Sequence, residues 1–438
     1  MSLPDFHGLT WTPSLFSLDP SWSIEPHPAA IAELVKSLGI ADAEITFLAQ
    51  GAFNKVYTIS LPWKEDLILR IALPVDPRFK TLSEVATMEW MLHNTSAPVP
   101  RVVRYGESRA NVVGLEWILM TRLEGRHLGD VWQTISYEAK EELVRRGAGV
   151  LGELFGRRLR GVGSIYSLLA GKKGATVPEM GRIVSMQFFW GDHIYQDVPR
   201  GPFTSSRDWM LARLSLHETE SRASLERLRD AEKEGMDSDD EDELESAKRT
   251  LDIVGGLKKV VDTVFPAEKA TEEEETVFFH HDLSNHNVLV DEEGALTGLL
   301  DWECVSAVSL WKACDFPEFL VEKPRVVRPD QSNYDLDNEG GADMYLRHSK
   351  EYEVTKLRQV FLGEMERVEP GWKEVFDRSQ RERDLDYAVL NCDCVLGARD
   401  VRWWCDDVVA GRGRMLSLEE RRYGFFERGD DRDTVSRI

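Results

Sequence analysis

The spacing of hydrophobic positions changes from helical to extended within the first 125 residues. Residues 29–38 place apolar side chains three to four positions apart, which predicts a helix. Apolar runs of strand length follow at 45–48, 55–61, 67–73, 101–106 and 115–123. A helical pattern over 81–94 separates the third of these runs from the fourth. This part of the chain therefore predicts a small sheet with one helix packed against it.

Beyond residue 125 the pattern is mostly helical, with one extended interruption. Helical spacing predicts helices over 137–157, 205–232, 251–265, 344–368 and 380–409. The interruption lies between 277 and 300, where strands at 288–290 and 295–300 flank a turn at 291–294. Because a hairpin of this size folds back on itself, the loop before it meets the residues after it.

Three polar side chains lie where the two ends of this hairpin meet. Asp282 and Asn287 are five residues apart in the loop before it, and Asp301 follows its second strand. This set suits one catalytic base and two oxygen ligands for a hard cation such as Mg²⁺. The alternative is a buried hairpin whose polar residues only form turns.

The order of these residues resembles that of protein-kinase-like phosphotransferases. His280, Asp282 and Asn287 match the pattern His-x-Asp-x-x-x-x-Asn, and Asp301 stands where that family carries a metal-binding Asp. The continuation Asp-Trp-Glu at 301–303, followed by Leu-Trp-Lys-Ala-Cys at 310–314, resembles the fungal set of the aminoglycoside phosphotransferase family. The resemblance implies an α+β fold of two lobes, a small antiparallel β-sheet lobe and a mainly helical large lobe.

The resemblance also implies roles for the hairpin residues, with ATP and Mg²⁺ as cofactors. Asp282 would accept the proton of an attacking hydroxyl, while Asn287 and Asp301 would hold Mg²⁺ on the nucleotide phosphates. Glu303 would assist at the metal or support its ligands. No Ala-Pro-Glu sequence of the protein-kinase activation loop follows Asp301, so the expected acceptor is a hydroxyl of a small molecule.

In the small lobe the resemblance points to residues that would bind the nucleotide. Arg70 takes the place of the usual phosphate-binding Lys, and Glu84, rather than Glu89, is its expected partner on the next helix. An ordinary surface ion pair is the alternative for Arg70. The backbone N–H groups of Gly51, Ala52, Phe53 and Asn54 would cap phosphate oxygens, although a plain hairpin has the same pattern. Met120 and Arg122 would belong to the hinge that binds adenine.

These assignments divide the chain into three parts. Residues 1–40 form an N-terminal extension and 41–123 the small ATP-binding lobe. Residues 124–438 form the helical large lobe, with a catalytic loop at 280–303 and an acidic insert at about 233–248. The composition of the acidic insert is more typical of a solvated loop or helix end than of a clamp for polycations. The pattern leaves open which of Asp384, Asp386, Asp393 and Asp406 would face an acceptor.

Composition limits the classes of partner that we expect this chain to bind. A formal net charge of −23 opposes binding to the phosphates of nucleic acids. The chain has no run of about 20 apolar residues for a membrane helix and no secretory pattern at residues 1–5, so a cytoplasmic protein is expected. No obligate protein partner is evident. Two alternatives remain: a nucleotide-binding pseudokinase that acts as an interaction module, and a choline- or homoserine-type metabolite kinase.

Overall fold

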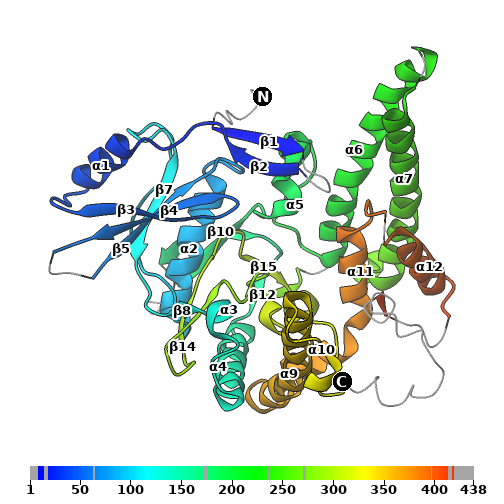
Figure 1. Ribbon diagram of the computed structural model, residues 1–438. Helices are drawn as coiled ribbons and strands as arrows, with labels where there is room; N and C mark the ends of the chain where they lie inside the picture. The colour runs from blue at the N-terminus through cyan, green and yellow to red at the C-terminus, as the bar shows by residue number, and fades with distance from the viewer. Residues whose placement is uncertain are drawn as a thin grey trace.

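The computed structural model describes residues 8–13, 18–62, 65–170, 176–234, 236–269, 273–395, 397–412 and 417–418. A small lobe, built on a five-stranded antiparallel sheet, lies beside a larger, mainly helical lobe (Figure 1). The order of strands in the sheet is β3-β4-β5-β7-β6. Their bounds are β3 Glu44–Gln50, β4 Asn54–Ser60, β5 Leu67–Ala72, β6 Val102–Gly106 and β7 Glu116–Thr121.

Two helices cover opposite faces of the small-lobe sheet. Helix α1 (Pro28–Ser37) is capped by His27, whose side chain accepts a hydrogen bond from the Ala29 N–H, and it buries Ile31 and Leu34 against the sheet. Helix α2 (Phe79–Asn94) packs on the other face, which is the face that meets the large lobe. Because side chains alternate along β5, Leu69 and Ile71 face the α1 side while Arg70 faces the other side.

The N-terminal extension contains a hairpin that the hydrophobic pattern did not predict. Strands β1 (Leu9–Pro13) and β2 (Leu18–Trp22) pair antiparallel. Trp11 lies 5.2 Å, between ring centroids, from Trp190, which follows the short helix α5 (Met186–Phe189) of the large lobe. The extension therefore contacts the large lobe as well as the small one.

The large lobe surrounds the hairpin of β13 (Val288–Val290) and β14 (Leu296–Leu299). Val288 pairs with Leu299, and Gly294 completes the turn with a φ of 90°, a conformation that favours glycine. Strand β8 (Arg126–His127) extends this sheet, and β12 (Glu275–Phe279) lies between β9 (Leu159–Arg160) and β15 (Ser306–Ser309) in a second one. A further hairpin, β10 (Ser164–Ala170) with β11 (Thr176–Gly181), packs beneath α2.

Helices supply the rest of the large lobe, together with short 3₁₀ turns such as η2 (Gly191–Tyr195). Helix α4 packs on α9, and α10 and α11 lie against α8. Among the described residues, no helix is both long and apolar enough to cross a bilayer. The bounds of the large-lobe helices are α3 Leu128–Val131, α4 Tyr137–Phe155, α6 Ser206–Glu234, α7 Ser238–Val264, α8 Leu310–Ala313, α9 Glu339–Val368, α10 Pro370–Arg378, α11 Gln380–Leu390 and α12 Ala398–Val409.

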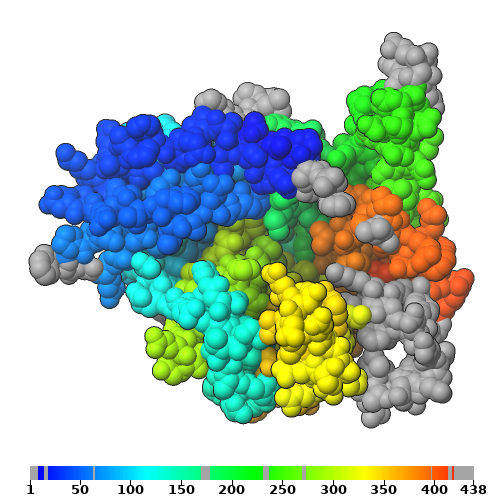
Figure 2. Space-filling view, in the orientation of Figure 1, coloured from blue at the N-terminus to red at the C-terminus, as the bar shows by residue number. Residues whose placement is uncertain are grey.

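The acidic insert is the start of a helix rather than a loop. The helix predicted over 251–265 begins at Ser238, so the acidic run occupies the first turns of α7. The Asp237 side chain accepts hydrogen bonds from the N–H groups of Asp239 and Asp240, and carboxylates in a first turn are favoured by the helix dipole. Helices α6 and α7 form an antiparallel pair that is packed into the large lobe at one end and projects from it at the other (Figures 1 and 2).

Candidate active site

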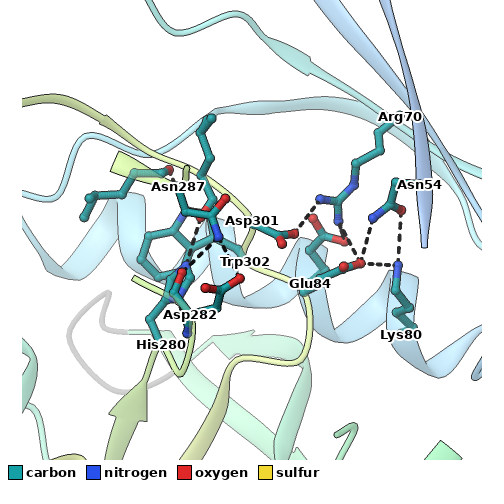
Figure 3. Close-up of polar contacts among 12 residues, drawn as sticks. Asn54, Arg70, Lys80, Glu84, His280, Asp282, Asn287, Asp301 and Trp302 are labelled. Carbon is teal, nitrogen blue, oxygen red and sulfur yellow. Dashed lines mark hydrogen bonds and ion pairs between the residues drawn. The ribbon is translucent and has the colours of Figure 1, made fainter. Parts of the chain in front are cut away.

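The hairpin of the large lobe brings its three predicted polar residues to one end. The Leu300 N–H donates to the Asn287 carbonyl (2.8 Å), which joins the two chain segments just beyond the paired strands. The Asn287 side chain then reaches back to the loop before it, where its Nδ2 donates to Oδ2 of Asp282 and to the Asp282 carbonyl, both at 2.9 Å. Asp301, the next residue after Leu300, has a φ of 61° and turns its carboxylate toward the small lobe (Figure 3).

His280 fixes the two loops to each other. Its Nε2 lies 2.9 Å from the Leu300 carbonyl, and its Nδ1 accepts a hydrogen bond from the Asp282 N–H (3.3 Å). Trp302 packs edge-on against the imidazole at 5.0 Å between centroids. Burial lowers the pKa of His280 to about 3, so the ring is neutral, with Nε2–H donating and Nδ1 accepting. The predicted pattern contained His280, but its structural role was not assigned from the sequence.

Across the cleft, Arg70 makes the contacts that an anchor between lobes requires. It forms an ion pair with Glu84 of α2, and its Nη1 lies 3.2 Å from Oδ1 of Asp301. Glu84 is buried and Glu89 is only half-buried, so the structure places the predicted partner, rather than its alternative, beside Arg70. The alternative of a surface ion pair does not hold, since the Arg70 side chain is 9% exposed.

Lys80 is a member of the site that the sequence analysis missed. It lies in the first turn of α2 with 2% of its surface exposed, and its Nζ is 2.5 Å from Oε2 of Glu303. Asn54 contacts both of them, accepting from Lys80 (3.2 Å) and donating to the same Glu303 oxygen (2.8 Å). Lys80 precedes Glu84 by four residues and so shares its helix face, which is the signal that could have identified it.

The carboxylates of the site differ in their protonation. Burial, followed by the charge of Glu303, raises the pKa of Asp301 to about 7. Burial would also raise the pKa of Glu303, but Lys80 and Arg70 outweigh it and hold that pKa at about 2. Glu303 is therefore ionised, with its charge balanced by Lys80 and Arg70, whereas Asp301 is paired with Arg70 and has the raised pKa.

A cleft of about 690 Å³ between the lobes is lined by Arg70, Asp301 and Glu303, and its volume is typical of small-ligand sites. Two of the predicted contacts are limited by hydrogen bonds within the protein. The Gly51 N–H donates to the Asn54 carbonyl (2.9 Å), so the predicted phosphate-capping loop loses that donor. The Arg122 N–H and side chain both bind Asp66, so this N–H is not available to bind adenine at the predicted hinge. The cleft contains all twelve predicted site residues: Gly51, Ala52, Phe53, Asn54, Arg70, Glu84, Met120, Arg122, Asp282, Asn287, Asp301 and Glu303.

A second cavity of about 250 Å³ lies beside the catalytic loop. His281 lines both this cavity and the cleft, so the two adjoin at the residue that precedes Asp282. Charged side chains from helices α8, α9 and α11 line it, among them Lys312, Arg358 and Asp384. Of the four carboxylates left open by the sequence, only Asp384 lines this cavity; Asp386 instead binds Arg213 and Lys312.

The chain is similar over part of its length to known proteins. The chain is 31% identical over 166 residues to a subtelomeric hrmA-associated cluster protein of Aspergillus fumigatus, an alignment covering 36% of this chain and 33% of that protein. It is 32% identical over 101 residues to the mitochondrial "altered inheritance of mitochondria protein 9" of Debaryomyces hansenii, covering 22% and 16%. The chain thus spans about a third or less of the length of these relatives.

Two solved structures are similar over most of the chain. The ADP-bound aminoglycoside phosphotransferase APH(2″)-Ib has a TM-score of 0.45 at 12% identity, covering 91% of this chain and 99% of that one. The ethanolamine kinase of Plasmodium vivax has a TM-score of 0.39 at 10% identity, covering 89% and 93%. The profile of the phosphotransferase enzyme family (APH) matches residues 44–308, more than half of the chain and the whole of the cleft described above. The two-lobe kinase-like fold expected from the sequence is confirmed, and the chain belongs to the APH phosphotransferase family.

Proposed function

We propose that this protein transfers the γ-phosphoryl group of ATP, with Mg²⁺, to a hydroxyl of a small molecule. The convergence of Asp282, Asn287 and Asp301 at the cleft, opposite Arg70, is the observation that supports this function best. Family membership supports phosphoryl transfer in general, and the arrangement of charged groups supports this particular form of it.

The residues of the cleft fit a magnesium ion. Because Asn287 uses Nδ2 for both of its hydrogen bonds to Asp282, its Oδ1 is the atom that would bind a cation. Asp301 is a partly exposed carboxylate whose pKa is raised by desolvation and by the charge of Glu303, and a divalent ion bound beside it would favour its ionised form. When bound, Mg²⁺ would neutralise charge on the phosphates. Glu303 has one oxygen engaged by Lys80 and Asn54, and its part in binding metal stays a prediction.

Each remaining residue has a defined task in this proposal. Asp282 accepts the proton of the acceptor hydroxyl, and Asn287 holds that carboxylate in place through the 2.9 Å hydrogen bond. Arg70 donates to phosphate oxygens while Glu84 orients its guanidinium. The acceptor would enter the 250 Å³ cavity, because it adjoins the cleft at His281, next to the proposed base.

A thermal-shift titration with ATP, with and without Mg²⁺, tests this proposal on the wild type and on Asp301→Ala. Stabilisation that requires Mg²⁺ and disappears in the variant would support the nucleotide and metal sites. Phosphoryl transfer is then measured with [γ-³²P]ATP against a panel of amino alcohols, sugars and aminoglycosides. No stabilisation at millimolar ATP would overturn the proposal.

A nucleotide-binding pseudokinase is the second candidate, and one contact favours it. Both ends of the Arg70 guanidinium bind carboxylates, Glu84 on one side and Asp301 on the other. An arginine held in this way would occupy the metal-binding carboxylate instead of the phosphates. ATP binding that is independent of Mg²⁺, together with no turnover across the acceptor panel, would support this candidate over the enzyme.

A further inference from the structure

Lys80, Asn54 and Glu303 form a closed triangle of contacts behind the cleft, here called the lysine lock. Lys80 Nζ contacts Glu303 Oε2 (2.5 Å) and Asn54 Oδ1 (3.2 Å), and Asn54 Nδ2 contacts the same Glu303 oxygen (2.8 Å). Figure 3 shows Asn54 and Lys80 on the far side of Arg70 from Asp282 and Asn287. Asn54, Lys80 and Glu303 are 6%, 2% and 9% exposed, so the contacts are screened little by water.

The three residues come from three segments whose relative positions must be fixed for the proposed reaction. Asn54 begins β4 and ends the loop that would cover the phosphates. Lys80 lies in the helix that carries Glu84, the partner of Arg70. Glu303 is two residues beyond Asp301. Movement of any one segment would break at least two of the three contacts.

The charges show why the lock depends on the lysine. Glu303 is a buried carboxylate, and its other cation, Arg70, lies farther away, with Nη2 at 3.8 Å. Removing Lys80 would leave a buried charge without its main partner, which is costly in a protein interior. Glu303 would then compete with Asp301 and Glu84 for Arg70, whose guanidinium already binds both.

We propose that Lys80 is a positioning residue of the phosphotransfer site. Through Asn54 and Glu303 it joins the loop at 51–54, here called the phosphate loop, to the loop at 300–304, here called the Asp301 loop. It also leaves Arg70 available to Glu84 and Asp301. Lys80 does not line the cleft, so it acts through these neighbours and not by touching the nucleotide. The kinetic part of this inference rests on the proposed function. The coupling between the two loops does not, because it is a property of the free protein.

The test compares Lys80→Met with Lys140→Met as a matched control. Lys140 is also a buried lysine (3% exposed) paired with a glutamate, Glu353, at 2.7 Å, but it lies in α4, away from the cleft. Hydrogen exchange of the free proteins is measured over peptides that contain 51–54 and 300–304. We expect Lys80→Met to speed exchange in both peptides by about tenfold or more, and Lys140→Met in neither.

A second variant, Glu303→Gln, keeps the side-chain size and guards against failure of Lys80→Met to fold. It should speed exchange in the same two peptides. Combining it with Lys80→Met should add little, because each change by itself already removes the ion pair between Lys80 and Glu303. With Mg²⁺-ATP, the Lys80 variant should bind about tenfold more weakly than wild type, while the Lys140 variant binds as wild type does.

The outcomes separate this inference from the proposed function. Unchanged exchange in both peptides, in Lys80→Met and in Glu303→Gln alike, would overturn the lock even if wild type binds Mg²⁺-ATP tightly. If wild type binds no nucleotide, the proposed function fails, whereas faster exchange confined to the two loops would still support the coupling. Equal loss of nucleotide affinity in the Lys80 and Lys140 variants would overturn the positioning role.

Discussion

Arg70 Nη1 lies 3.2 Å from Asp301 Oδ1, so one ion pair joins β5 of the small lobe to the catalytic hairpin of the large lobe. The same guanidinium binds Glu84 through its other terminal nitrogen. A guanidinium can serve two carboxylates at once because its donors are fixed in a fork, whereas an ammonium is a single point charge. The arginine at this position therefore makes a contact between lobes that a lysine would make less well.

We expect Arg70→Lys to weaken Mg²⁺-ATP binding even though the charge is retained. The ammonium that pairs with buried Glu84 has fewer donors left for phosphate oxygens than the forked guanidinium has. The loss would cost about 1–2 kcal/mol of binding free energy, or roughly a tenfold rise in Kd. Isothermal titration with Mg²⁺-ATP measures this. Tighter binding in the lysine variant would instead show that the Arg70–Asp301 pair blocks the metal site, as the pseudokinase alternative requires.

Asp282→Asn should separate binding from chemistry. The amide keeps the size of the side chain but cannot accept the acceptor's proton, so turnover should fall by at least about 10²-fold while ATP affinity stays nearly intact. Initial rates with the best acceptor of the panel, together with ATP titrations, provide the check. Turnover equal to wild type would remove Asp282 from the role of base.

The phosphate loop is anchored by an aromatic side chain, which leads to a third prediction. Phe53 is 5% exposed and packs edge-on against Phe189 (5.5 Å between centroids) of the large lobe. Phe53→Ala should lower the free energy of unfolding by about 3–5 kcal/mol and also weaken ATP binding, because the loop loses its attachment. Phe155→Ala, which empties a comparable buried site in α4, should lower stability without the change in affinity. Equal ATP affinities in the two variants would contradict the anchoring role.

The parts of the site that depend on local spacing could be predicted from the sequence. A hairpin of fixed length brings Asp282, Asn287 and Asp301 together whatever surrounds it. Helix periodicity placed Glu84 and Glu89 on different faces, and the family resemblance then selected Glu84. Lys80 was missed because the predicted helix began at residue 81, one residue too late to include it, whereas α2 begins at Phe79. Errors of one or two residues at helix ends therefore matter when an end residue lies in the site.

Contacts between segments far apart in sequence could not be predicted in the same way. The cavity beside His281 is formed by α8, α9, α10 and α11, whose relative placement follows from packing and not from any one pattern. The N-terminal hairpin was not predicted from a segment rich in Pro, Ser and Trp. Two of its prolines, Pro13 and Pro20, lie in a sheet of only two strands, where a missing N–H costs little. The start of α7 did carry a signal, an Asp before a first turn of carboxylates.

Asp384, in the proposed acceptor cavity, should make stability depend on pH. Burial raises the pKa of its carboxyl to about 6 from an ordinary 3.8, even though its Oδ1 accepts hydrogen bonds from Gln380 and from the Leu418 N–H. The folded state thus favours the protonated form, and its stabilising effect, complete below pH 3.8, is lost as pH rises through about 6.

The gap between these two pKa values corresponds to on the order of 3 kcal/mol at neutral pH. Asp384→Asn removes the ionisation but keeps an oxygen for the Leu418 N–H. The free energy of unfolding of this variant should therefore increase relative to that of wild type as pH rises. From pH 5 to pH 8 that gain should be about 1 kcal/mol, measured as the difference between urea denaturation curves of the two proteins, which cancels the titration of all other groups. A difference that stays constant over this range, or that shrinks with pH, would show that Asp384 is ionised in the folded protein, and the cavity would then present a negative charge to its ligand at every pH tested.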